Sequence, residues 1–436
     1  VTLMLKGGIL MLPSSLQAVL EKAADRLKDQ PHLLETFQNA FVSTIDTTWK
    51  QLPDGESFVI TGDIPAMWLR DSSAQVRHYL PFVKEDEELR KLIEGLIARQ
   101  MRCILLDPYA NAFNEEANGN RWCEDRTQHL QMVWERKYEV DSLCYPVQLS
   151  YLYWKESGSS AIFTPSFHRA MDTVVETFRT EQRHFERSPY RFIRPEENCN
   201  GLEQETLQND GMGMPVNYTG MTWSGFRPSD DACTFGYLVP SNMFAVVILG
   251  YLAEMAEAGF GDQLLRDKAL RLRHEIDYGI RHYAIWRHPV YGPIYAYETD
   301  GFGNYTLMDD ANVPSLLSIP YLGYRPVEDP IYQNTRRFIL SKENPYYYEG
   351  TVARGIGSPH TPENYIWHIA LSMQGLTAST RQEAEEMIRL ILSTDAGCAR
   401  MHEGFDVNDP SQFTRPWFAW ANSLFAELVY KTYLAD

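Results

Sequence analysis

The stretch SSLQAVLEKAADRLKD, residues 14–29, indicates the kind of fold that the chain adopts. Its apolar residues recur every three or four positions, so they lie on one face of an α-helix while charged residues cover the other. The serines at its start are the expected helix cap. Residues 262–282 repeat the pattern over a longer range. Both stretches predict amphipathic helices that pack on a common core.

The rest of the chain shows the same periodicity, and the sequence predicts an all-α fold. Further helices are expected at residues 32–50, 86–106, 139–155, 160–185, 240–258, 327–342, 363–376, 380–395 and 413–434. Asp71 or Ser72 is the expected cap of a helix that carries Tyr79. Strand signals are weaker, and residues 289–298 and 346–354 predict short hairpins.

Helical hairpins joined by long polar and aromatic loops favour a toroid of paired helices, with a pocket formed by loops at one end. A plain helical bundle or an open solenoid is the simpler alternative. The long loop at residues 187–239 disfavours it, because loops of that length are usually functional. No clear linker divides residues 14–436, which predicts a single domain. Residues 1–13 form a leading segment of uncertain order, too short to span a bilayer.

The charge of the chain restricts its partners. The formal net charge is −18 over 436 residues, which argues against nucleic acid and anionic membranes because both are bound by clusters of Lys and Arg. No run of residues has the length and apolar character that we expect of a membrane span. The 10 Trp, 25 Tyr and 20 Phe exceed what a core needs, so we expect some of them to line a groove.

Cysteine usage predicts a reducing, cytoplasmic location. The six cysteines are scattered and form no C-x-x-C pair, which excludes a disulfide scaffold. They are Cys103, Cys123, Cys144, Cys199, Cys233 and Cys398. Metal binding is not supported either: Asp309, Asp310 and Asn312 lack the twelve-residue calcium-loop pattern. We expect neither a metal nor another cofactor.

The segment DIPAMWLRDS, residues 63–72, indicates a carbohydrate pocket. Trp68 offers an aromatic face on which the C–H face of a sugar ring stacks. Arg70 and Asp71 offer donors and acceptors in fixed directions for vicinal hydroxyls. A buried ion pair at a helix start and a core tryptophan explain the same residues equally well.

Two further segments supply carboxylates, and glycosidic bonds are cleaved by pairs of carboxyl groups. Asp230 or Asp231 follows Arg227 in a loop, where neighbouring like charges raise the pKa of one member and suit it to be a general acid. Glu403 is the second candidate, with Asp406 as a nearby competitor. Turn-forming or exposed loop carboxylates are the simpler explanation for each of them.

Other residues leave rival functions open. His360 lies in a rigid loop before a helix, where a histidine contacts a hydroxyl or serves the structure. The segment WERKYEVD, residues 134–141, is either a helix start near the pocket or a solvated face. A helical-toroid sugar epimerase would use His360 and His402 as acid and base. A non-catalytic glycan-binding protein would use Trp68 and its neighbours as a lectin site.

Three motifs resemble those of glycoside hydrolase family 125. They are GDIPAMWLRDSSAQ at 62–75, TWSGFRPSDD at 222–231 and HEGFD at 402–406, and the resemblance extends from about residue 14 to the end. It implies an (α/α)6 barrel and an exo-acting α-mannosidase that removes non-reducing α-1,6-linked mannose from oligosaccharides such as those derived from N-glycans. The family inverts the anomeric configuration and is not thought to need a metal.

The resemblance also assigns roles to residues. It makes Asp230 the general acid and Glu403 the general base. It points to Trp68, Arg70 and Asp71 near the subsite for the terminal mannose. The further candidates for substrate binding are Arg227, Asp231 and His360. Inversion predicts that the two catalytic carboxyl groups lie about 6.5–9.5 Å apart, against about 5–5.5 Å for retention.

Overall fold

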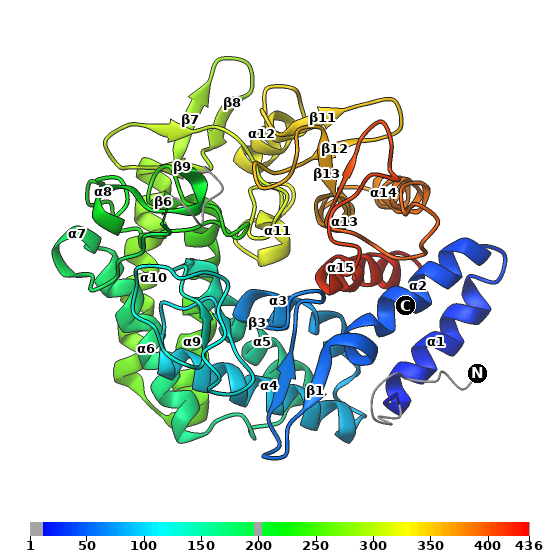
Figure 1. Ribbon diagram of the computed structural model, residues 1–436, viewed down its shortest axis with the longest axis horizontal. Coiled ribbons are helices and arrows are strands. Elements are labelled where there is room, and N and C mark those ends of the chain that lie inside the picture. The colour runs from blue at the N-terminus through cyan, green and yellow to red at the C-terminus, as the bar shows by residue number, and fades with distance from the viewer. Residues whose placement is uncertain (1–11, 196–202, 436) are drawn as a thin grey trace.

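The computed structural model describes residues 12–195 and 203–435 and is mostly helical (Figure 1). The α-helices of nine residues or more are α1 (Ser14–Arg26), α2 (Pro31–Ser43), α4 (Glu87–Leu106), α5 (Val140–Ser157), α6 (Pro165–Glu181), α9 (Val239–Phe260), α10 (Gln263–Tyr283), α12 (Pro330–Ile339), α13 (His368–Leu376), α14 (Arg381–Ser393) and α15 (Ala419–Val429). The shorter ones are α3 (Leu69–Ala74), α7 (His184–Arg187), α8 (Gln208–Gly211) and α11 (Ile319–Leu322). The predicted predominance of helices is therefore confirmed.

Amphipathic helices alternate along the chain with buried ones. α4, α6, α10, α12 and α14 each bury one face, whereas α9, α13 and α15 are apolar around most of their surface. Several amphipathic helices begin at a side-chain cap; Asp262, for example, accepts a hydrogen bond from Leu265 N at 3.0 Å. α10 therefore begins and ends close to the range that its periodicity predicts.

Two predicted caps are wrong. The cap position of α1 is Pro13, and the carboxylate of Asp86 instead accepts from Ser15 N at 2.9 Å. α3 begins at Leu69, so Asp71 and Ser72 lie inside the helix and are buried. The reason is tertiary: the residue before α3 is held in a strand, and that pairing starts the helix three or four residues earlier than the predicted caps would.

The helices follow one another around the middle of the molecule (Figure 1). α9 packs on α5 and on α10, α3 packs on α5, and α13 packs on α14 and α15. α15 also packs on α2, which brings the last long helix against the first part of the chain. Segments from both ends of the sequence therefore lie side by side.

The helix α9 is 22 residues long and apolar enough, by length and composition, to cross a membrane. Of its most apolar window, 61% is buried inside the protein, against α5 and α10. The expectation that no run has this character is thus wrong for α9. A buried core helix of a soluble fold passes the same test.

Short antiparallel strands connect the helices. The pairs are β1 (Trp49–Gln51) with β2 (Ser57–Val59), β7 (Ile285–His288) with β8 (Gly292–Tyr295), β11 (Tyr347–Glu349) with β12 (Arg354–Ile356), and β13 (Tyr365–Trp367) with β14 (Gly404–Asp406). Two three-stranded sheets join β3 (Met67–Trp68), β4 (Ala112–Phe113) and β5 (Val133–Glu135), and β6 (Tyr237–Leu238), β9 (Glu298–Thr299) and β10 (Tyr305–Thr306). The hairpin predicted at 346–354 is confirmed as β11–β12. The one predicted at 289–298 is confirmed in part, because the range holds β8 while its partner β7 lies before it.

Candidate active site

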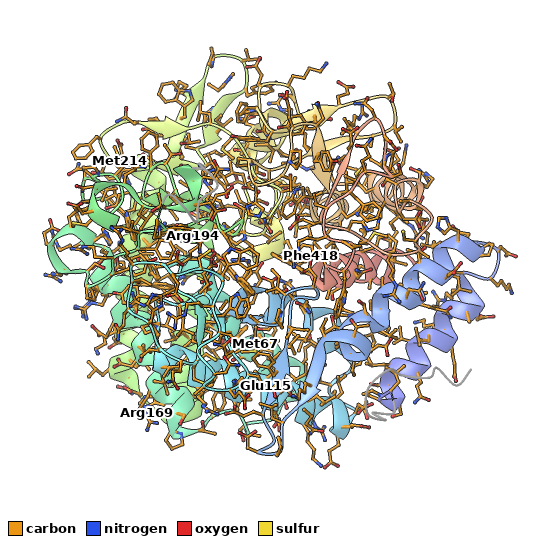
Figure 2. All side chains as sticks on the ribbon, viewed as in Figure 1. Met67, Glu115, Arg169, Arg194, Met214 and Phe418 are labelled. Atoms are coloured by element: carbon orange, nitrogen blue, oxygen red, sulfur yellow. The ribbon has the colours of Figure 1, made fainter. Side chains whose placement is uncertain are left out.

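A pocket opens at the beginnings of the buried helices. It is lined by Thr61, Ile64, Trp68, Arg70, Asp71, Pro228, Ser229, Asp230, Asn312, His360, Trp367, Glu403, Arg415, Phe418 and Trp420, and holds about 360 Å³ of empty space. Trp68, Trp367 and Phe418 are the residues directly before α3, α13 and α15. Figure 2 labels Phe418 near the middle of the view. Each helix thus presents its first turn to the pocket.

The two neighbouring aspartates lie in one tight turn, which points their side chains into different surroundings. Asp230 has a φ of 67°, in the left-handed region that Asp tolerates better than most residues. The turn is closed by Arg227 N, which donates to Asp231 O at 2.7 Å, and by Asp230 N, which donates to Arg227 O at 2.9 Å. Asp230 lines the pocket with 26% of its side chain exposed, whereas Asp231 is buried. The two carboxylates therefore have different surroundings.

Arg70 is the centre of the charge on one wall of the pocket. Its guanidinium nitrogens lie 2.5 Å from Glu139 Oε2, 3.3 Å from Asp141 Oδ2, 3.3 Å from Asp230 Oδ1 and 3.4 Å from Asp71 Oδ2. Arg70 is almost fully buried, and so are three of the four acids. The guanidinium fork thus orders several carboxyl groups at once.

Two further polar side chains, those of Asn111 and Lys137, contact Asp230. Asn111 Nδ2 lies 3.4 Å from Asp230 Oδ1 and also reaches Glu135 and Glu139. The ammonium of Lys137, which is buried, donates to the backbone oxygen of Asp230 at 2.6 Å. The turn that carries Asp230 is therefore fixed by Asn111, directly before β4, and by Lys137, between β5 and α5.

These contacts shift the pKa values of the acids in opposite directions. Burial raises the pKa of Asp230, but Arg70 and a hydrogen bond from Glu139 outweigh burial and hold it below its usual range. Burial raises the pKa of Glu139 well above its usual range, against Arg70, and the charge of Asp230 adds to the rise. The rise expected for one of the two neighbouring aspartates is not found at Asp230, and the nearby acid with the raised pKa is Glu139.

Glu403 also lines the pocket, directly before β14. Gly404 pairs with Trp367 in β13, so one two-stranded sheet positions both the acid and a pocket tryptophan. Glu403 is 5% exposed, and Arg415 Nη1 donates to its Oε1 at 3.4 Å. That is the one side-chain contact of the Glu403 carboxylate that the described residues supply. The carboxylate keeps lone pairs for a water molecule.

Arg415 also connects two distant segments. Its Nη2 lies 2.6 Å from Asp63 Oδ1, and Asp63 N donates to Trp417 O at 3.2 Å. Gly62 has a φ of 138°, and a Cβ there would lie 2.2 Å from Trp417 O. The close approach requires glycine at this position. The start of the 62–75 motif is thereby held against the loop that carries Arg415.

The predicted substrate-binding residues fall into two groups. Trp68, Arg70, Asp71 and His360 line the pocket with the two candidate catalytic acids. Arg227 and Asp231 lie behind it: Arg227 Nε lies 2.6 Å from Glu298 Oε1, and Asp231 Oδ1 lies 3.0 Å from His360 Nδ1. Those two residues do not line the pocket and can act on a substrate only through the residues that they contact.

The histidines do not form an acid–base pair. Burial lowers the pKa of His360, but its hydrogen bond with Asp231 outweighs burial and raises the pKa to about 9. His402 is buried, stacks on Phe413 with ring centroids 3.7 Å apart, and has a lowered pKa because of burial. It is not among the residues that line the pocket. The arrangement that an epimerase with these two histidines requires is therefore not present among the described residues.

Some site residues have no clear signal in the sequence. Asn111 and Arg415 belong to none of the motifs, and their contacts reach far along the chain. Glu139 and Asp141 lie in the segment 134–141, for which the sequence leaves a pocket position and a solvated face equally open. Both are completely buried. Within the described residues, no group of three His, Cys, Asp or Glu side chains is arranged to hold a metal ion.

Comparisons with known proteins identify the family of the chain. Residues 30–430 match the family described as metal-independent alpha-mannosidase (GH125). The chain is 39% identical over 437 residues to the meiotically up-regulated gene 157 protein of Schizosaccharomyces pombe (strain 972 / ATCC 24843), covering 95% of this chain and 85% of that protein.

A solved structure is closer still. It is a metal-independent α-mannosidase of Streptococcus pneumoniae in a non-productive complex with α-1,6-mannobiose. It shares 49% identity with a TM-score of 0.93, and the match covers 97% of this chain and 99% of that one. The chain belongs to glycoside hydrolase family 125, the metal-independent α-mannosidases.

Proposed function

We propose that this α-mannosidase is an exo-acting enzyme that removes non-reducing terminal α-1,6-linked mannose with inversion. The observation that carries the proposal is the meeting of Asp230 and Glu403, far apart in the sequence, in one pocket. The exo action is what the resemblance of the three motifs implies. The α-1,6-mannobiose bound by the S. pneumoniae relative supports the linkage.

In the proposed reaction, Asp230 is the general acid and Glu403 the general base. The Asp230 carboxyl gives its proton to the glycosidic oxygen, which leaves with both electrons of its bond to the anomeric carbon. Glu403 takes a proton from a water molecule that attacks that carbon from the opposite face. The products are mannose and the shortened glycan. Glu403 then releases its proton to solvent and Asp230 takes one proton up, which restores both acids.

The other pocket residues hold the terminal sugar. Trp68 offers its ring face, and its Nε1 is buried without a hydrogen-bond partner among the described residues. A sugar hydroxyl would satisfy that donor. Arg70 and Asp71 supply further donors and acceptors, and His360 contributes a positive charge at neutral pH. Arg227 and Asp231 act through these residues.

The finer architecture is part of the proposal. We infer a closed (α/α)6 toroid, with inner helices α3, α5, α9, α11, α13 and α15 and outer helices α2, α4, α6, α10, α12 and α14. The alternation of buried and amphipathic helices and the packing of α15 on α2 support it. Pocket residues from Thr61 to Trp420 support one catalytic domain over residues 14–436. A cytoplasmic location is supported by the free thiols of the five described cysteines; Cys199 lies outside the described residues.

The linkage is tested with mannobioses joined α-1,2, α-1,3 and α-1,6, incubated with the protein in the presence of a chelator. We expect turnover of the α-1,6 isomer at least about tenfold faster than that of the others, which corresponds to about 1.4 kcal/mol of discrimination. An α-1,6-linked mannotriose labelled at its reducing end should first give unlabelled mannose and labelled mannobiose. Labelled mannose as the first labelled product, or loss of activity with chelator, would contradict the proposal.

A further inference from the structure

We propose that Glu139 is the proton partner of Asp230: the two carboxyl groups hold one proton between them, and the pair supplies the proton that the leaving oxygen takes. Glu139 is then a positioning residue that acts through Asp230. The proposal rests on the proposed function, because it needs Asp230 as the general acid. The motifs give the role of general acid to Asp230 alone, and the proposal adds the carboxyl group of Glu139 to that role.

The geometry places both carboxyl groups on the same two donors. Arg70 Nη1 lies 2.5 Å from Glu139 Oε2, and Arg70 Nη2 lies 3.3 Å from Asp230 Oδ1. Asn111 Nδ2 lies 3.4 Å from Glu139 Oε1 and 3.4 Å from Asp230 Oδ1. The two carboxyl groups also interact directly, since the charge of Asp230 raises the pKa of Glu139. A hydrogen bond between two carboxyl groups requires a proton on one of them.

The charges around the pair favour keeping that proton. Four described carboxyl groups lie within 3.4 Å of the single guanidinium of Arg70. If all four were ionised in this buried place, the negative charges would exceed the positive charge beside them. The charged and titratable groups that face the pair are Arg70, Asp71, Lys137, Asp141 and His360. Lys137 offsets part of the excess, but its ammonium contacts the backbone oxygen of Asp230 rather than the carboxylate.

The two acids differ in a way that assigns the resting proton to Glu139. Glu139 has no exposed surface, so no solvent stabilises its charged form. Asp230 is partly exposed to the pocket, where water stabilises its charge. The pKa directions agree, since that of Glu139 is raised by burial and that of Asp230 is lowered by Arg70 despite burial. Coupled carboxyl pairs titrate as a unit.

During turnover the shared proton passes from Glu139 to Asp230, and the Asp230 O–H donates to the glycosidic oxygen as its bond to the anomeric carbon breaks. The electron pair of that bond goes to the leaving oxygen, and the pair of acids is left with two negative charges. After the sugar leaves, the pair takes one proton from water. Glu403 releases the proton that it took from the attacking water, so the balance over one turnover is zero.

The test compares Glu139→Gln with wild type on two substrates across a range of pH. Gln keeps a hydrogen-bond donor toward Asp230 but leaves the latter to titrate alone beside Arg70. With α-1,6-mannobiose, we expect kcat at neutral pH to fall about 10- to 100-fold. The basic limb of the kcat profile should move down by about one pH unit or more. With 2,4-dinitrophenyl α-mannoside, whose leaving group needs no proton, kcat should fall by less than about threefold.

Asp141→Asn is the matched control, because Asp141 contacts the same guanidinium at 3.3 Å and is as deeply buried. It should move the basic limb down by less than Glu139→Gln does, because Asp141 raises the pKa of Glu139 only through its charge. Glu139→Asp, which keeps a carboxyl group, should retain most of the wild-type basic limb. An unmoved basic limb in Glu139→Gln, equal losses on both substrates, or an equal shift in Asp141→Asn would overturn the proposal.

Wild-type enzyme keeps the proposal testable if the Glu139 variants do not fold. Its kcat profile with α-1,6-mannobiose must then show a basic limb above about pH 6, absent with the dinitrophenyl substrate; a limb near pH 4, the range of an isolated carboxyl group, would overturn it. Failure of the proposed function gives different results. Wild type would not turn over the mannobiose, or Asp230→Asn would keep its full rate on it.

Discussion

The two candidate catalytic carboxylates lie in one pocket but are built in opposite ways. Asp230 sits on a left-handed turn and is surrounded by Arg70, Asn111 and the ammonium of Lys137. Glu403 directly precedes a short strand, and Arg415 at 3.4 Å is its one side-chain contact among the described residues. Asp230 is thus surrounded by charged and polar groups, whereas Glu403 keeps lone pairs that are free to accept hydrogen bonds.

The difference matches the two proposed tasks. A general acid must be protonated when the substrate arrives, so its neighbours have to control a proton in a buried place. A general base must accept a proton from water, so it needs room and unused lone pairs. The environment of Asp230 therefore sets its titration, while that of Glu403 sets the position of a water molecule. The four predictions below test that contrast.

The largest effect is expected from Glu403→Gln. Without the base, the attacking water is not activated whatever the leaving group is. We expect kcat to fall about 10³- to 10⁴-fold with both α-1,6-mannobiose and 2,4-dinitrophenyl α-mannoside, measured as mannose release. Asp406→Asn is the control: Asp406 lies three residues further on, accepts from Asn408 N at 2.7 Å and does not line the pocket. A normal rate in Glu403→Gln would remove it from the mechanism.

Asp230→Asn should depend on the leaving group instead. We expect a fall of about 10²- to 10⁴-fold with α-1,6-mannobiose, which needs a proton, and less than about tenfold with the dinitrophenyl substrate. Asp231→Asn tests the choice between the neighbours, because Asp231 is buried against His360. It should affect both substrates alike. A leaving-group-dependent loss in Asp231→Asn would exchange the two roles.

A smaller effect is expected from Asp63→Asn. The change weakens the contact of Asp63 with Arg415, whose Nη2 lies 2.6 Å away, and loosens the loop beside Glu403. Because Asp63 is partly exposed, we expect kcat/KM for α-1,6-mannobiose to fall only about three- to tenfold, mainly through KM. Glu254→Gln breaks an exposed ion pair with Lys155 outside the pocket and should change nothing. Equal changes of kcat/KM in both variants would show that the contact of Asp63 with Arg415 does not matter for activity.

The smallest effect concerns stability and pH. The pKa of His360 is raised from 6.5 to about 9 in the folded protein by Asp231, against burial. Its contribution to stability is therefore fully present below about pH 6.5 and lost as the pH rises through about 9. We expect on the order of 1–2 kcal/mol, because a third of the side chain meets solvent.

The measurement is the free energy of unfolding in urea at about pH 6 and about pH 9.5. Wild type should lose more stability between the two values than His360→Gln, which has no titrating ring. An equal loss in both proteins would assign the pH dependence to other groups and leave His360 as an uncharged pocket residue.

Much of the helical framework could be predicted from the sequence, because the amphipathic helices carry a local signal. α10 shows it best: its apolar positions recur along one face, and Asp262 caps it. The start of α3 could not be predicted in the same way. Pairing of Trp68 with Ala112 starts the helix at Leu69, and no local pattern encodes a strand partner that distant.

The residues of the site also fall into those with a local sequence signal and those placed by long-range contacts. Asp230, Glu403, Trp68 and Arg70 belong to motifs that a reader of the sequence can find. Asn111 and Arg415 could not be found, since their functions come from contacts across long sequence separations. For Glu139, the charged segment 134–141 gave a signal that equally favoured a solvated face, and only its burial beside Arg70 decides between the two.

The most direct test of the account is proton NMR of the anomeric region while the protein, treated with a chelator, hydrolyses α-1,6-mannobiose. Spectra are taken before the released sugar mutarotates. The account predicts that β-mannose appears first, because water activated by Glu403 attacks the face opposite the bond that Asp230 protonates. Initial release of α-mannose would contradict it, since retention requires one of the two carboxylates to act as a nucleophile.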